Sequence, residues 1–172
     1  MMSRKILITY ATKAGSTKKV AARMAELASQ HGFSADLLPV SAVKSIDSYD
    51  TVVLGSAVRM GRVLPEAQSF VEKNQAGLKQ KEFDTFALCM TLSTVNEENL
   101  KKSNAFLDPI KMVVEPAHAA VFPGEINLKS LGWLDRKIIG MVKSQVGDFQ
   151  DWIAMETWME SVLQSDSPSV RA

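Results

Sequence analysis

The chain has 172 residues, of which 46% are hydrophobic and 23% charged, and its formal net charge is +1 at pH 7. This length suits one well-packed domain, and the near-zero charge excludes a general attraction to nucleic acid and an acidic docking surface. No run of about 18 apolar residues indicates a membrane span, and the first apolar stretch is too short for a signal peptide, so we expect a cytoplasmic protein.

The first half of the chain alternates between strand and helix patterns. An apolar run at 4–10 predicts a buried strand, and apolar residues at helical spacing predict an amphipathic helix over 16–30. We expect Gly32 to end that helix, because glycine readily adopts left-handed backbone. Two further strands are predicted at Ser34–Leu38 and Tyr49–Ser56, the second with a continuous apolar core.

The same alternation continues in the second half. Leu64-Pro65 is expected to open a helix, since proline suits the first helical turn. Thr85–Met90 predicts a fourth strand, and a helix over roughly 96–107 is expected to be interrupted at Pro109. His118–Phe122 predicts a fifth strand, which the following Pro-Gly pair would end.

Two helical patterns close the chain. The segment 129–146 has an apolar stripe with basic residues beside it, which suits either a helix on the core or a helix on a membrane surface. Residues 149–164 predict an amphipathic helix against the core, and the polar residues 165–172 predict a flexible tail. We therefore expect a single domain over 1–164.

Apolar strands that alternate with helices are typical of an α/β fold, a doubly wound parallel sheet with helices on both faces. Five strands fit the spatial order 2-1-3-4-5. In that topology ligands bind at the carboxyl ends of the strands, beside the switch point between the first and third strands. The loops 11–17, 56–63 and 91–98 would meet there.

The loop after the first strand has the composition of an anion site, because it joins hydroxyls and backbone amides to the positive end of a helix. It lacks the residues of a P-loop, of a dinucleotide fingerprint and of an acidic Mg²⁺ site. A metal-free phosphate monoester fits, and the candidate donors are Thr12, Lys13, Ala14, Gly15, Ser16 and Thr17. The alternative is that Ser16 or Thr17 only caps the helix.

With this loop and the loop Gly55-Ser56-Ala57-Val58-Arg59-Met60-Gly61, the chain resembles the flavodoxin-like FMN-binding family. Within the family it is most similar to the menaquinone-dependent protoporphyrinogen dehydrogenase branch. Further points of likeness are Phe122-x-Gly124, Asp135-Arg136 and Asp151-Trp152.

The resemblance implies FMN as the cofactor, with its phosphate held by Thr12 to Thr17. One side of the isoalloxazine would be lined by Ser56, Ala57, Val58, Arg59, Met60 and Gly61, and the other by Thr91, Leu92, Ser93 and Thr94. It also implies a small-molecule or quinone redox partner. In the resembling dehydrogenases the segment that corresponds to 129–146 is linked to quinone use and membrane association, which implies a protein peripheral to the inner face of the membrane.

The chain departs from many flavodoxins in two ways. Neither presumed ring loop contains an aromatic residue, so Val58, Met60 and Leu92 would supply the apolar contacts and one ring face would be open to a substrate. Arg59 and Arg62 would place positive charge near the ring, which raises the potential of a flavin. Both features favour oxidation of an organic substrate.

The sequence thus predicts an FMN-dependent oxidoreductase. An electron carrier without its own substrate and an interaction module without cofactor remain alternatives. No histidine or carboxylate is placed as a general acid or base, and no metal site is expected, since His118 has no Cys or His at ligand spacing. Cys89 is expected to be a core thiol and His31 a surface residue, and the sequence leaves the oligomeric state open.

Overall fold

The computed structural model describes residues 3–126, 147–148 and 150–165. Its centre is a parallel sheet in the order β2-β1-β3-β5-β6. The strands are β1 (Lys5–Ala11), β2 (Ser34–Pro39), β3 (Thr51–Arg59), β5 (Glu82–Cys89) and β6 (His118–Pro123). Counted along the chain without the short β4, this is the order 2-1-3-4-5, so the predicted fold is confirmed.

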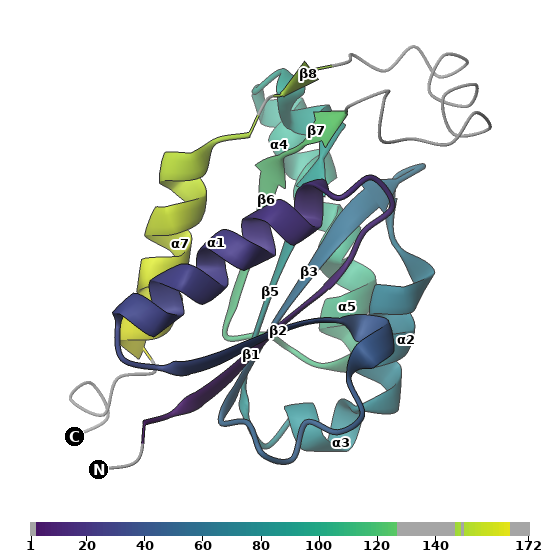
Figure 1. The fold of residues 1–172 in the computed structure, drawn as a ribbon. Coiled ribbons are helices and arrows are strands. Elements are labelled where there is room, and N and C mark those ends of the chain that lie inside the picture. The colour runs from purple at the N-terminus through teal and green to yellow at the C-terminus, as the bar shows by residue number, and fades with distance from the viewer. Residues whose placement is uncertain (1–2, 127–146, 149, 166–172) are drawn as a thin grey trace.

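Helices cover both faces of the sheet (Figure 1). One face carries α1 (Ser16–Gln30) and α7 (Trp152–Ser165), as their shared core cluster shows. The other carries α2 (Pro65–Lys73), α3 (Gln75–Leu78) and α5 (Asp108–Val113). Because both faces are covered, β1 and β3 are apolar and buried along most of their length, as the sequence predicted.

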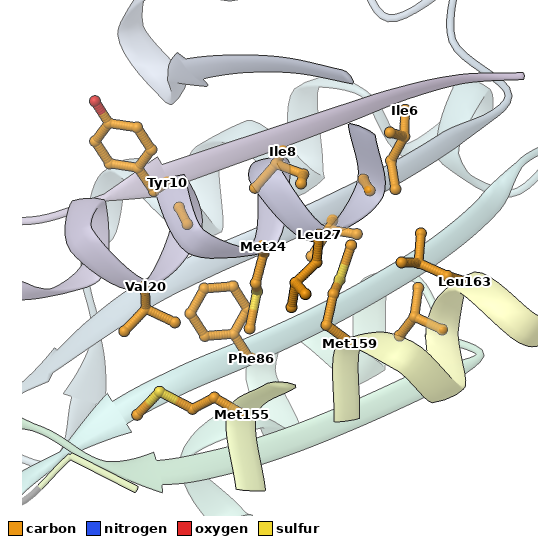
Figure 2. Packing of buried hydrophobic residues seen from close by; sticks show 14 of the residues in the cluster. Ile6, Ile8, Tyr10, Val20, Met24, Leu27, Phe86, Met155, Met159 and Leu163 are labelled. Atoms are coloured by element: carbon orange, nitrogen blue, oxygen red, sulfur yellow. The ribbon is translucent and has the colours of Figure 1, made fainter. Parts of the chain in front are cut away.

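The core between the sheet, α1 and α7 combines aliphatic side chains with methionine and aromatic ones (Figure 2). Met24 from α1, Phe86 from β5 and Met159 from α7 converge there, all buried. The Phe86 ring also meets Trp158 edge to face, with 5.9 Å between centroids. This packing fixes α1, whose first residues belong to the candidate site, on the sheet.

Two predicted segments need correction. The loop 56–63 is a β-hairpin, because β3 runs on to Arg59 and pairs antiparallel with β4 (Arg62–Val63). Pro109 does not interrupt a helix but lies in the first turn of α5, where its missing N–H costs nothing. It follows α4 (Glu97–Asn104) and a short 3-10 segment, Ala105–Leu107.

The remaining elements are short: the 3-10 helices Val40–Ala42 and Met90–Ser93, and the paired strands β7 (Glu125–Ile126) and β8 (Gly147–Asp148). The predicted segment 129–146 lies outside the described residues. Among the helices that the structure describes, none is long and apolar enough to cross a membrane. Lipid contact by 129–146 therefore stays a prediction.

Candidate functional site

The register of the sheet brings the three predicted loops to one edge. Ala11, the last residue of β1, lies opposite Ser56 of β3, and Ala57 lies opposite Leu88 of β5. The loop before α1, the β3–β4 hairpin and the segment after β5 therefore start side by side at the carboxyl ends of the strands. This is the edge where doubly wound sheets bind ligands.

The first loop ends in an uncapped helix. Gly15 is the N-cap of α1, with left-handed backbone (φ 92°), and no side chain caps the helix. The alternative that Ser16 or Thr17 only caps α1 is therefore wrong, since both lie in the first turn. The first-turn amides of α1 keep the capacity to bind an anion at the positive end of the helix dipole.

Thr12 shapes this loop from inside. Its Oγ1 accepts a hydrogen bond from the Gly15 backbone N–H at 3.0 Å. The Gly15 amide is thus directed at Thr12 rather than outward, which differs from its predicted role. The Thr12 hydroxyl still has its own hydrogen to donate, because a hydroxyl donates one hydrogen bond and accepts others.

The Thr17 side chain has an unusual environment at the carboxyl ends of the strands. Its side chain is fully buried, and its Oγ1 has no hydrogen-bond partner among the described residues. A buried hydroxyl without a partner costs roughly 1–3 kcal/mol, so such atoms are rare in folded proteins. A ligand atom that accepted from this hydroxyl would remove the cost, and it would reach the hydroxyl only after a rearrangement of the loop, because Thr17 has no exposed surface.

Lys13 links the first loop to α2. Its Nζ lies 3.2 Å from Oε1 of Glu66, in an exposed ion pair. The pKa of Glu66 is lowered, first by its hydrogen bond to its own backbone N–H in the first turn of α2 and then by Lys13. The pair is screened by solvent and therefore contributes little to stability.

In the hairpin, Ser56 has a structural role. Its Oγ accepts from the Leu64 backbone N–H at 3.1 Å and donates to the Ala57 carbonyl at 2.8 Å, and its side chain is fully buried. The bond from Leu64 ties β3 to the chain that returns from β4. Ser56 therefore positions the hairpin, whereas the residues beyond it form the surface of the edge.

The hairpin tip presents an apolar side chain to solvent. Arg59 and Arg62 are partners in the backbone register of β3 and β4. Met60 and Gly61, the two residues between them, have positive φ angles of 54° and 74°. Two left-handed residues make a type I′ turn, which matches the twist of a hairpin. Met60 is 76% exposed at this tip.

The third loop divides into an inward and an outward part. Leu92, in the 3-10 segment Met90–Ser93, is buried with Cys89 and Phe106, so it would reach a ligand only after a rearrangement. Thr94 accepts at its carbonyl from the Asn99 side chain at 2.7 Å, while Val95 is 68% exposed. Asn96 caps α4 through its bond to the Asn99 N–H.

Sequence comparison identifies relatives of the whole chain. A model of the flavodoxin domain family matches residues 7–152. The chain is 22% identical over 181 residues to protoporphyrinogen IX dehydrogenase [quinone] of Escherichia coli strain K12, covering 97% of this chain and 99% of that protein.

Solved flavodoxins share the fold. A short-chain flavodoxin associated with a non-canonical PDU bacterial microcompartment superposes with a TM-score of 0.63 at 12% identity, covering 95% of this chain and 99% of the other. A flavodoxin from Streptococcus pneumoniae TIGR4 gives 0.60 at 14% identity, with the same coverage.

Proposed function

The chain belongs to the flavodoxin domain family, and on that premise we propose that it binds FMN and oxidises a protoporphyrinogen-like substrate with a quinone as electron acceptor. The full-length similarity to a quinone-dependent protoporphyrinogen IX dehydrogenase carries the choice of reaction. The geometry at the carboxyl edge supports the choice of cofactor.

The phosphate of FMN fits the start of α1. The helix end is uncapped, Thr12 has a hydroxyl hydrogen to donate, and the buried Thr17 hydroxyl has no partner. The side chain of Ser16, half-buried in the same turn, is the third predicted hydroxyl donor. Hydrogen bonds to a charged acceptor are the strong class. Thr12 and Ser16, joined by Thr17 once the loop opens toward its hydroxyl, can therefore hold a phosphate dianion without a metal.

The hairpin and the third loop would then flank the ring. Bound FMN supplies the capacity to take up electrons from one partner and pass them to another. Arg59 and Arg62 bring positive charge to the hairpin, which favours the reduced form of the cofactor. Met60 and Val95 leave apolar side chains exposed on both loops, as a site for an apolar organic substrate requires.

The proposal is tested with FMN-reconstituted protein under anaerobic conditions. Protoporphyrinogen is added with or without a quinone, and the fluorescent porphyrin product is followed. The substrate loses electrons and protons, and the quinone takes them up to become a quinol. We expect porphyrin formation that depends on both FMN and quinone and exceeds the spontaneous rate.

The other outcomes separate the alternatives. Stoichiometric FMN binding without quinone-dependent turnover would remove the substrate assignment, and a potential of the bound FMN far below that of quinones would then favour an electron carrier. Protein that fails to quench the fluorescence of added FMN would refute the cofactor assignment and leave an interaction module.

A further inference from the structure

Three potential metal ligands lie together at the amino ends of the strands, at the end of the sheet opposite the candidate flavin site. Their spacing in the sequence did not indicate a shared site. Asp84 of β5 and His118 of β6 are partners in the strand register, and Glu82 precedes Asp84 by two residues on the same face of β5. One ligand atom from each of the three lies within 4.8 Å of the others. The parallel pairing of β5 and β6 creates this cluster.

Asp84 is the unusual member of the cluster. Its side chain has no exposed surface, and its Oδ1 lies 2.7 Å from Nδ1 of His118. Its other oxygen, Oδ2, is buried and has no hydrogen-bond partner within the part of the chain that the structure describes. A buried carboxylate oxygen without a donor is costly, and a cation shared with Glu82 and His118 would supply the missing partner.

The electrostatics agree with the geometry. Burial raises the pKa of the Asp84 carboxyl, and the hydrogen bond and charge of His118 lower it by less. The neighbouring Glu82 carboxylate raises it further. The Lys81 ammonium, which is close in sequence, donates instead to the Tyr49 carbonyl at 2.6 Å. The indication of a cation therefore rests on the geometry, a buried Oδ2 without a partner among the described residues, in a residue grouped with two further ligands.

We propose that Glu82, Asp84 and His118 bind a divalent cation of the zinc class, with solvent at the fourth position. Carboxylate oxygens and an imidazole nitrogen are the donors that zinc accepts. In a tetrahedral site with bonds of about 2.0–2.2 Å, ligand atoms lie about 3.4 Å apart. The Asp84–His118 pair would open slightly and Glu82 would move inward to reach that spacing. His118 is 29% exposed, so the ion has a path from solvent.

This site is independent of the proposed flavin chemistry, because it lies at the amino ends of the strands. The ion would link β5 to β6 at the start of β6. Because it would bind only the folded state, it would stabilise the folded protein. At a free concentration of 100 times Kd we expect the melting temperature to rise by about 5–10 °C.

The test uses untagged full-length protein, freed of metal with a chelator that is then removed. Zn²⁺ is titrated calorimetrically, and Co²⁺ is titrated by visible absorption, whose intensity and wavelength report low coordination number and nitrogen or oxygen ligands. We expect one ion per chain. Asp84→Asn and His118→Gln each alter a direct ligand, so each should weaken Zn²⁺ binding by at least the roughly 10–100-fold that loss of a group hydrogen-bonded to a ligand costs. His31→Gln is the matched control, because the chain has two histidines and His31 is exposed at the end of α1.

Two results would overturn the proposal. One is the absence of stoichiometric Zn²⁺ and Co²⁺ binding by the folded wild-type protein, which needs no variant and so does not depend on how the substitutions fold. The other is unchanged affinity in His118→Gln, or an equal loss in His31→Gln, either of which would place the ion elsewhere.

Discussion

At the scale of single residues, substitution of Thr17 tests whether its unpartnered hydroxyl belongs to a ligand site or is only a defect in packing. Thr17→Val replaces a buried hydroxyl that has no partner with a methyl group of the same size. The free energy of unfolding without FMN should stay equal or rise by up to about 1 kcal/mol, since no protein hydrogen bond is lost. FMN binding should weaken by about 1.5–3 kcal/mol, roughly 10–150-fold, because a bond to a charged acceptor disappears. Urea unfolding and FMN fluorescence titration measure the two effects.

Thr9→Val is the matched control for this experiment. Thr9 also has a fully buried hydroxyl without a partner, but it lies within β1 and not in the loop. Its substitution should have a similarly small effect on unfolding and leave FMN affinity within about twofold. If Thr17→Val bound FMN as tightly as the wild type, the phosphate would not contact Thr17.

At the scale of elements, the pairing of β3 with β5 depends on the absence of a side chain at Gly55. A Cβ there would lie 2.2 Å from Cζ of Phe86, the residue opposite in register. Phe86 is fully buried and packs on Trp158, so its ring has little room to move. Gly55→Ala should destabilise the protein by about 1–3 kcal/mol, observed as a melting temperature lower by about 2–12 °C.

The contrast is Gly124→Ala, where the added Cβ would meet Leu88 Cβ at an ordinary 3.5 Å. That substitution should change stability by less than about 1 kcal/mol. Phe86→Leu should lessen the cost of Gly55→Ala, with a coupling of about 0.5–3 kcal/mol in a double-mutant cycle. Additive effects would show that the clash is relieved in some other way.

The elements also show what a sequence can predict. The helix 16–30 was predicted to the residue, because its apolar spacing and the Gly32 stop are local signals. The β3–β4 hairpin was missed, although Val58 and Val63 flank a turn with Gly61 and pair in the structure. The Asp84–His118 contact could not be predicted from spacing, because it joins residues 34 positions apart through strand register. For the same reason, the sequence identified Thr17 as a donor but not that its hydroxyl lacks a partner.

At the scale of the whole molecule, the two proposed sites lie at opposite ends of one rigid sheet. With a rise of about 3.3 Å per residue, β5 separates Asp84 from Cys89 by about 17 Å. Sites this far apart without shared partners should act independently. FMN and Zn²⁺, each at 100 times its Kd, should each stabilise the fold by about 2.7 kcal/mol, and together by the sum within about 0.5 kcal/mol. Unfolding of the four samples, with neither ligand, either or both, measures this. A change of more than about threefold in FMN affinity on adding Zn²⁺ would instead show that the sheet transmits a structural change between its two edges.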